Sequence, residues 1–556
     1  MFKRASFHVS FIFYFYVKLL VLNMKLSFDK VLVSDVAVVG SGLAGLSVVF
    51  FLEQTLKDFL DKAVSVVLIS KSPLGYATST YYSAGAFRCP VGGYSPNEFY
   101  TETLEAGRYI NRSSLVKALV SDAAESVLAL EKTGLRFRQQ RGMLRVISKD
   151  DLYPGKELVL TLKSYTLSKR NVRVLENAFV LDVIVGGDGS LYLPCLSRDN
   201  VVLVNAKAVV LATGGAANVY SRSDNPPQLS SDGHGIALRL GLPLIDMEFV
   251  QFHPLGLLKR DMPGIILPST LASHGKLINK LGEDVVQKYG LESLVKAIVY
   301  YRDRLSRCAI SEILAGRGVE GGLVLQLEPS SVNEHTLRRL NLGQRIIVLP
   351  TAHFSMGGVK IDDQGRTPIR GVYAIGELAG GLHGANRLGG NALTACVVFA
   401  RRAAKDIMRY VAEEFRERLE PSIDAEVIRS YLDRYTPREG FLRAADVRTE
   451  VRGLMWSYAG VVRSPESLRQ CLDKLAEIYE KLDRVKIDNR QEVMRYAEAE
   501  NTLLTALAVT HSALVRTESR GSHYRTDYPE EDPKWVKSIR VELRYGKYYL
   551  TIENLT

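Results

Sequence analysis

A glycine-rich stretch near the start of the chain has the residue types and spacing of a phosphate-binding turn. The stretch reads, in order, Gly40, Ser41, Gly42, Leu43, Ala44 and Gly45. Glycines at these spacings allow a tight turn, close approach of the backbone to a pyrophosphate, and close packing of a helix on a strand. The N–H groups that open such a helix attract phosphate. The stretch therefore predicts binding of a dinucleotide.

The elements around the turn strengthen this prediction. Residues 36–40 form an apolar strand, a helix follows to about Lys62, and residues 65–71 form a second strand, which together make a βαβ unit. The second strand ends at Ser70-Lys71, without the acidic residue that binds ribose in typical NAD enzymes. Residues 75–87 are rich in Ser, Thr and Gly, which suits close approach to a large flat cofactor, although an ordinary polar loop is the alternative.

The rest of the chain divides by pattern, and 556 residues are enough for several domains. A strand over 206–215 ends in two glycines, residues 216–236 read as a loop, and 538–552 read as a hairpin. The predicted division is 1–23 as a non-structural extension, 24–237 and 353–420 as two segments of one nucleotide-binding domain, 238–352 as an inserted domain, 421–531 as a helical domain, and 532–556 as a hairpin tail.

Composition and charge narrow the class of protein. With 46% hydrophobic and 24% charged residues, the chain resembles an ordinary soluble globular protein. The net charge of +11 comes from scattered basic residues without aromatic or zinc-finger patterns, so nucleic acid is not an expected partner. Excess positive charge is also what a small dianionic substrate would favour. No metal site is expected, because no C-x-x-C pair occurs among the five cysteines. Buried thiols in a reducing cytoplasm are predicted at Cys89, Cys195, Cys308, Cys396 and Cys471.

The N-terminus carries an apolar run over residues 7–22 that resembles a signal or anchor. Lys18 interrupts the run, no small-residue cleavage site follows, and the run is shorter than the roughly 20 residues that span a bilayer. We expect Met24 to be the functional start, with a peripheral anchor as the alternative. The predicted location is the cytoplasm, or the inner face of the membrane if a partner subunit holds the chain there.

Seven stretches in order make the chain resemble the flavoprotein subunit of the fumarate reductase and succinate dehydrogenase family, whose near relative is L-aspartate oxidase. The resemblance covers nearly everything after Met24. It implies an α/β fold with a Rossmann-like FAD-binding domain, an inserted α+β capping domain and a C-terminal helical domain. Besides the glycine turn, the stretches are ATGG (212–215), DMEFVQFHP (246–254), RDRLSR…EILAGRG (302–318), TAHFSMGGV (351–359), GELAGGLHGANRLGGNAL (376–393) and ESRGSHYRTDYP (518–529).

The resemblance implies that the dinucleotide is FAD. Membrane-bound members attach FAD covalently through a histidine, and the matching position here is Ser79, so noncovalent FAD is expected. Beyond the glycine turn, the resemblance assigns flavin contacts to Ser70, Lys71, Ser79, Thr80, Ala84, Gly85, Asp232, Glu377, Ala392 and Leu393.

The resemblance also implies a C4 dicarboxylate substrate, held rigidly so that one carbon lies over the flavin while a proton donor faces its neighbour. It places His253, His353 and Arg387 on the two carboxylates. Arg302 falls on the arginine that donates the proton, with Asp303 as a candidate to orient it. The ordinary alternatives are core histidines for His253 and His353, and a helix with surface ion pairs for Arg302.

The chain departs from the family in the inserted domain. Members usually carry Thr-Glu and then Arg-Gly-Glu-Gly, in which Thr holds a carboxylate while Glu and Arg relay a proton. Here Pro268 and Ser269 stand at the Thr-Glu positions, Ala272 at the Arg and His274 at the second Glu. Three explanations stay open: His274 with water replaces the relay, the substrate differs, or catalysis is slow.

Three functions are weighed on this basis. The leading one is interconversion of fumarate and succinate, because AGGLHGANRLGGNAL resembles that branch of the family. The runner-up is L-aspartate oxidase, which makes iminoaspartate, and the third is a flavin-binding subunit with weakened catalysis. The sequence has no iron–sulfur ligands, so a respiratory or thiol-linked reductase would need an iron–sulfur partner subunit for electron transfer.

Overall fold

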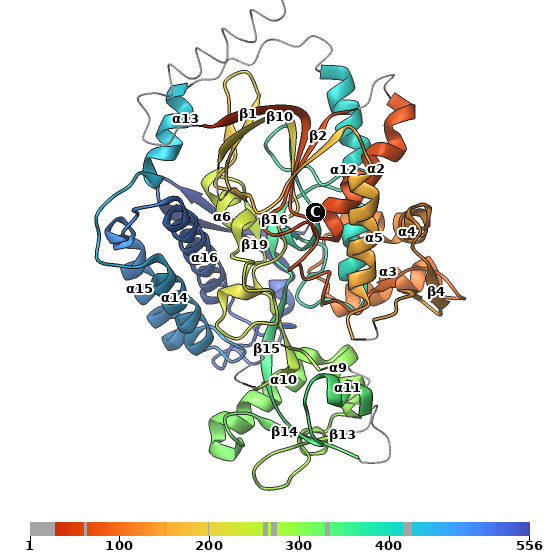
Figure 1. Cartoon of the computed structure of the whole chain (residues 1–556). Helices are drawn as coiled ribbons and strands as arrows, with labels where there is room; N and C mark the ends of the chain where they lie inside the picture. The colour runs from red at the N-terminus through yellow and green to blue at the C-terminus, as the bar shows by residue number, and fades with distance from the viewer. Residues whose placement is uncertain are drawn as a thin grey trace, which may run out of the picture.

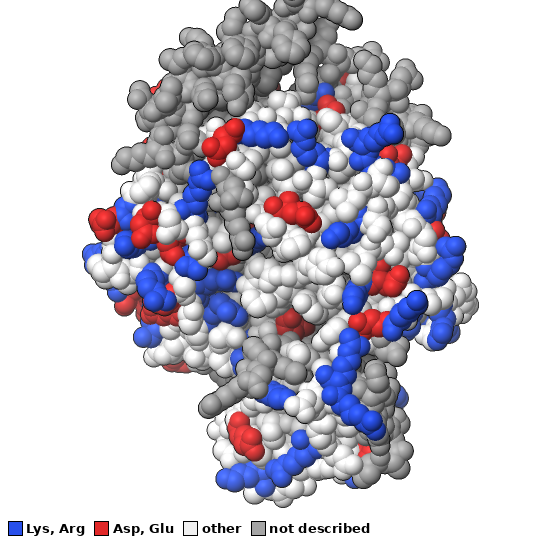
Figure 2. Space-filling model, viewed as in Figure 1, with Lys and Arg blue, Asp and Glu red and all other residues white. Residues whose placement is uncertain are grey.

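The computed structural model describes residues 28–59, 64–150, 152–197, 200–259, 265–267, 275–328, 334–414 and 425–555. The predictions for residues 1–23 and for His274 fall outside these ranges. Within them, no helix is both long enough and apolar enough to cross a membrane. On the face shown in Figure 2, Lys and Arg side chains are interspersed with Asp and Glu. All five cysteines are free thiols, of which Cys396 is half-buried and the other four are buried.

A mainly parallel sheet lies at the centre of the molecule. Its strands are β1 (Lys30–Val39), β2 (Val66–Ile69), β6 (Val172–Leu175), β7 (Phe179–Val180), β8 (Ile184–Val185), β9 (Leu191–Leu196), β10 (Val201–Leu211) and β17 (Val372–Ala374). The order is β6-β2-β1-β10-β9-β7, with β17 also against β10 and β8 against β9. The second half of β1, Val36–Val39, is apolar and buried, and β10 is mostly apolar and almost entirely buried, as expected for a parallel sheet covered on both faces.

Helices cover one side of this sheet, where Figure 1 shows α2 and α12 next to β2, and α3 and α4 farther from the sheet. They are α2 (Leu43–Phe59), α3 (Pro96–Ala106), α4 (Ser113–Ala129), α5 (Gly155–Leu167) and α12 (Asn391–Glu414). α2 packs against α12 and α5, and its first ten residues are almost all buried, which explains why both of its faces are apolar. A small sheet of β3 (Ala86–Arg88), β4 (Phe137–Gln140) and β5 (Met143–Val146) extends this side.

A second sheet forms the separate lobe drawn at the bottom of Figure 1. It is antiparallel and consists of β12 (Val250–Leu257), β15 (Arg345–Ser355), β14 (Leu323–Leu327) and β13 (Gly275–Ile278). The helices of this lobe are α8 (Val285–Lys288), α9 (Leu294–Tyr300), α10 (Arg302–Glu312) and α11 (Glu334–Arg339). Its buried residues form their own cluster from Leu255 to Val348. This cluster falls inside the range predicted for the inserted domain, whose boundaries stay a prediction.

The C-terminal part is helical and ends in a hairpin. The long helix α16 (Arg490–Val515) packs against α14 (Ala444–Tyr458), α15 (Pro465–Glu480) and α6 (Asp232–Arg239), and α13 (Ala425–Leu432) precedes them. β19 (Lys537–Arg544) and β20 (Lys547–Asn554) pair as the predicted hairpin, joined by Tyr545 and Gly546 at positive φ. The hairpin completes a sheet with β11 (Leu244–Ile245), β16 (Gly358–Lys360) and β18 (Ala379–Gly380).

Candidate active site

The glycine turn connects β1 to α2 and has no room for side chains at two of its positions. A Cβ added to Gly40, whose φ is 113°, would lie 2.2 Å from the carbonyl oxygen of Ala212. A Cβ added to Gly45 would lie 1.9 Å from the carbonyl oxygen of Gly40. Strand, turn and helix can therefore pack this closely only with glycine at both positions.

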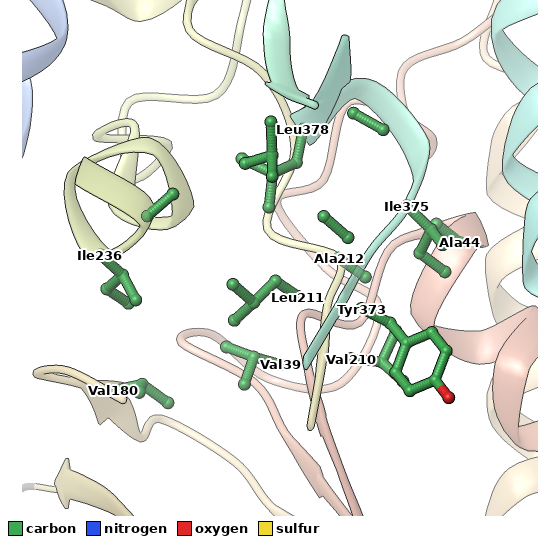
Figure 3. Close-up of a cluster of buried hydrophobic side chains, with 14 of the residues drawn as sticks. Val39, Ala44, Val180, Val210, Leu211, Ala212, Ile236, Tyr373, Ile375 and Leu378 are labelled. Atoms are coloured by element: carbon green, nitrogen blue, oxygen red, sulfur yellow. The ribbon is translucent and has the colours of Figure 1, made fainter. Parts of the chain in front are cut away.

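A pocket opens at this turn, where segments far apart in the sequence meet. Figure 3 shows part of its apolar wall, with Val39 from β1, Val180 from β7, Ile236 from α6 and Ile375 just after β17. Most of the predicted flavin contacts line it. They are Gly40, Ser41, Gly42, Leu43, Ala44, Ser70, Lys71, Ser79, Thr80, Asp232 and Glu377.

Five predicted contacts do not line this pocket. Gly45 faces the backbone of Gly40 instead, and Ala392 and Leu393 lie in the first turn of α12. Ala84 is exposed, and Gly85 lies against Val146. Flavin contacts at these positions stay predictions.

Other residues line the pocket without having been singled out. Thr213 and Gly214 follow β10, at the two glycines that end the strand predicted over 206–215, where the main chain can approach a ligand closely. Gln228 and Leu229 come from the segment predicted as a loop over 216–236. The loop prediction is wrong at the end of this segment, because α6 begins at Asp232. The stretch 178–180 gave no signal, since β7 is too short to show periodicity.

The polar groups of the pocket fit a dinucleotide. The hydroxyls of Ser79 and Thr213 are buried and have no hydrogen-bond partner in the described part of the chain. Lys71 stands where NAD enzymes have an acidic residue, and its Nζ lies 2.9 Å from Asp232 and 2.6 Å from Glu498. Burial alone would raise the pKa of Asp232, but Lys71 lowers it overall. The pocket thus offers a helix N-terminus, glycine backbone and unpaired hydroxyls to a ligand.

A second cluster brings together four of the predicted substrate residues. Arg302 Nη1 and Arg387 Nη2 both donate to Oε1 of Gln251, at 3.3 and 3.1 Å. Arg387 Nη2 also lies 3.2 Å from Nε2 of His353. The rings of His253 and His353 are 5.6 Å apart. Residues from β12, α10, β15 and the loop before α12 therefore converge on one place.

The two arginines of this cluster form no ion pair with a carboxylate in the part of the chain that the structure describes. Arg387 is buried, lies over the ring of Phe354 at 4.4 Å, and its Nε has no hydrogen-bond partner in the described residues. Arg302 is half-buried at the start of α10, where its Nε donates to the carbonyl oxygen of Ile298 at 2.7 Å. Within the described ranges neither guanidinium forms an ion pair, which argues against the surface-helix alternative for Arg302. Such a pair of cations suits a dianion.

The ionisation of the cluster follows from burial and like charge. Burial and the neighbouring Arg387 lower the pKa of Arg302 to about 9. Burial lowers the pKa of Arg387 to about 10. The pKa values of His253 and His353 lie well below their usual range because burial, full for His253 and partial for His353, disfavours the charged ring and both rings face the arginines. An entering dianion would relieve this repulsion.

One acidic residue in the cluster was missed by sequence reasoning. Asp224 Oδ2 lies 2.7 Å from Nδ1 of His353, and burial raises the pKa of Asp224 to about 8. Asp303, which was predicted to orient Arg302, instead accepts a hydrogen bond from Asn386 at 3.3 Å. Nothing in the sequence around Asp224 marked it, since it lies in a polar segment between predicted elements.

β15 connects the cluster to the pocket. His353 and Ser355 are two residues apart on this strand, and the Ser355 N–H donates to Glu377 Oε1 at 3.1 Å. Glu377 lines the pocket, and burial raises its pKa to about 7. The Ala216 N–H donates to Ser355 Oγ at 3.0 Å. The hydrogen bond between Ser355 and Glu377 therefore links the strand that carries His353 of the cationic cluster to the wall of the pocket.

Comparisons with known proteins agree with this geometry. A model of an FAD binding domain matches residues 35–393, and a model of the C-terminal part of the fumarate reductase flavoprotein matches residues 448–555. The chain is 33% identical over 539 residues to one of the subunits of the CoM/CoB fumarate reductase of Methanothermobacter marburgensis, covering 91% of this chain and 96% of that protein. It is 31% identical over 542 residues to L-aspartate oxidase 1 of Ralstonia nicotianae, covering 91% and 97%.

A solved structure shows the same architecture. A mutant of the E. coli quinol fumarate reductase FrdA matches with a TM-score of 0.85 and 28% identity over 95% of this chain and 97% of that chain. Fold and pocket together define an FAD-dependent oxidoreductase with a Rossmann-like nucleotide-binding domain and a C-terminal helical domain. The chain belongs to the family of fumarate reductase and succinate dehydrogenase flavoproteins, which also includes L-aspartate oxidase.

Proposed function

We propose that this flavoprotein interconverts fumarate and succinate. The observation that carries the proposal is the pair Arg302 and Arg387, which share the oxygen of Gln251 and have no ion-pair partner among the described residues. Two cations, Arg387 buried and Arg302 half-buried, whose hydrogen bonds among the described residues go to neutral groups fit the two carboxylates of a C4 dicarboxylate. Matches to fumarate reductases over about nine tenths of the chain support the same substrate class.

In the proposed reaction, Arg387, His253 and His353 hold the carboxylates. FAD, when bound, supplies hydride transfer to one alkene carbon of fumarate. Arg302 gives a proton to the neighbouring carbon, which its depressed pKa of about 9 favours over an ordinary arginine. Gln251 keeps the two guanidinium groups together by accepting from both.

L-Aspartate oxidation is the second candidate, and Asp224 is the observation that favours it. A carboxylate in a cationic site could receive the ammonium group of an amino dicarboxylate. Both oxygens of Asp224 already have partners, however, since Oδ2 faces His353 at 2.7 Å and Oδ1 accepts from Asn225 at 3.0 Å. Asp224 is thus already engaged by the protein itself, and we rank a substrate without an amino group first.

Two assays separate these candidates. Purified protein with reduced viologen and fumarate should oxidise the viologen and form succinate, while L-aspartate with oxygen should give little product. Detection of iminoaspartate formation alone would replace the leading function with L-aspartate oxidase. Failure of both assays in protein that retains FAD would favour the flavin-binding protein with weakened catalysis.

The cofactor and the partner are tested separately. Because Ser79 stands where the covalent histidine would be, acid precipitation should release FAD into the supernatant, and flavin that stays with the chain would contradict noncovalent binding.

We also propose that an iron–sulfur subunit exchanges electrons with this chain. An iron–sulfur protein that copurifies with the chain would support this partner, and an FAD protein that is isolated alone would favour a self-sufficient oxidase.

A further inference from the structure

Asp224 is tied to His353 in two ways. Its side chain is only 14% exposed, and Oδ2 lies 2.7 Å from Nδ1 of His353. Asn225, the next residue, donates to Asp224 Oδ1 at 3.0 Å and to the backbone carbonyl of His353 at 3.0 Å. The loop that carries Asp224 and Asn225 therefore contacts both the ring and the backbone of His353.

The contact on the other ring nitrogen decides the tautomer of His353. Nε2 lies 3.2 Å from Nη2 of Arg387, and a guanidinium nitrogen can only donate a hydrogen bond. Nε2 must therefore accept, which leaves the ring proton on Nδ1, where it is donated to Asp224. A carboxylate that accepts Nδ1–H commonly fixes the tautomer and orientation of a functional histidine.

The other ionisable groups that face His353 are mostly basic. His253 comes from β12, Arg302 from α10 and Arg387 from the loop before α12. Asp224 is the acidic group in direct contact with the ring, and Glu377 is the next carboxyl group near Asp224. Without an anion from outside, burial and the two arginines keep His353 neutral.

Resting on the proposed function, we propose that Asp224 is a positioning residue that prepares His353 to bind a substrate carboxylate. By accepting Nδ1–H, it turns Nε2 toward Arg387, the other proposed carboxylate anchor. Once a dicarboxylate neutralises the arginines, the charge of Asp224 allows His353 to become an imidazolium that donates from Nε2. When Asp224 is protonated, its carboxyl group loses the proton that forms the new N–H bond at Nε2. When Asp224 is ionised, that proton comes from the solvent.

The ionisation of Asp224 agrees with this role. Burial raises its pKa to about 8, so near neutral pH the pair already holds the proton that the imidazolium needs. The proton belongs to the pair, because two groups this close titrate together. Dicarboxylate binding by the wild type should therefore depend little on pH between pH 6 and pH 8.

The first experiment needs no substrate. Histidine-selective ¹⁵N labelling followed by NMR should show His353 as the Nδ1–H tautomer in the FAD-loaded protein, with its signals assigned by their loss in His353→Gln. Asp224→Asn should change this pattern. A His353 ring protonated on Nε2 alone, or a pattern that Asp224→Asn leaves unchanged, would overturn the inference.

The second experiment measures succinate binding through the flavin absorbance. At pH 8, Asp224→Asn should bind succinate about 10- to 100-fold more weakly, the usual effect of removing a carboxylate behind a functional histidine. Its affinity should recover as the pH falls toward 6, while the wild type stays nearly constant. Asp446→Asn, an exposed acid in α14 whose side chain is 68% exposed, serves as the control and should behave like the wild type. Unchanged affinity in Asp224→Asn would overturn the inference.

A double-mutant cycle asks whether Asp224 acts through His353. In a His353→Gln background, Asp224→Asn should cause little further loss of affinity, because the group that it positions is already gone. Additive losses would show that Asp224 acts independently and would refute the positioning role. If the wild type binds neither succinate nor fumarate but shows the expected tautomer, the proposed function fails while the role of Asp224 in holding His353 stands.

Discussion

Two groups of buried or half-buried arginines in this protein have different kinds of partner. Near the C-terminus, Arg516 is fully buried, and its Nε and Nη1 lie 2.5 Å and 3.0 Å from the carboxylates of Glu248 and Glu518. At the candidate active site, Arg302 and Arg387 donate to Gln251, and no carboxylate pairs with either among the described residues. In the first group, carboxylates of the same chain neutralise the arginine. The second leaves two positive charges for an anion from outside.

The same contrast appears in the pKa values of buried arginines. At Arg239, burial acts to lower the pKa, but Asp182 and Glu500 raise it above the ordinary value overall. At Arg302, burial and a second arginine lower it to about 9. A buried cation beside carboxylates serves the fold, whereas one beside another cation is held at a cost that a bound anion offsets.

The largest expected effect concerns Arg302. Arg302→Ala should lower fumarate reduction by about 10²- to 10⁴-fold, the usual contribution of a positioned proton donor. The FAD content should stay the same, because Arg302 does not line the flavin pocket. Arg304→Ala, an exposed substitution on the same helix, is the matched control and should stay near wild-type activity. Steady-state kinetics with absorbance of bound flavin measures both, and near-wild-type turnover in Arg302→Ala would reject its role as proton donor.

The second effect concerns stability at the other cluster. Arg516→Met leaves Glu248 and Glu518 without their buried partner and should lower the free energy of unfolding by about 3–5 kcal/mol. Arg443→Met removes an exposed pair, whose arginine is 76% exposed, and should cost no more than about 1 kcal/mol. Denaturant unfolding measures both variants. Equal stability of the two would mean that the buried cluster does not hold the C-terminal region together.

The third prediction concerns pH. The protonated Arg302 is the form that binds an anion and donates a proton, so kcat/KM for fumarate should fall as the pH rises through about 9. The value of kcat at saturating fumarate should fall only at higher pH, since a bound dianion raises the pKa of the arginine. Rates measured from pH 7 to pH 10.5 test this, and a kcat/KM that stays level across pH 9 would contradict the assignment.

The smallest effect sharpens the contrast between the clusters. Arg302→Met should change the free energy of unfolding by no more than about 1 kcal/mol, or raise it, because the substitution removes a cation that burial and Arg387 already disfavour. The measurement is the same denaturant unfolding used for Arg516→Met, on FAD-loaded protein. A loss as large as that expected for Arg516→Met would show that Arg302 serves the fold.

Much of the flavin pocket could be predicted because its glycines serve local geometry. Gly45 is required by the backbone of Gly40 on the same strand, turn and helix, whereas Gly40 is required by Ala212 just after the neighbouring strand β10. The spacing of the glycines within one short stretch still makes both recognisable in the sequence. The stretch 178–180 and Gln228 could not be predicted, because their place in the pocket depends on how distant segments fold back.

The sequence by itself determined the order of the elements, the need for glycine at the turn, and the residue types that could hold a dicarboxylate. Those properties follow from periodicity, backbone sterics and chemical character, which are local. Only the tertiary structure decided that Arg302 shares Gln251 with Arg387 and that Asp224 faces His353 across 129 positions of sequence. Such pairings depend on how β12, β15 and α10 pack together, and this packing leaves Arg302 and Arg387 without an ion-pair partner among the described residues.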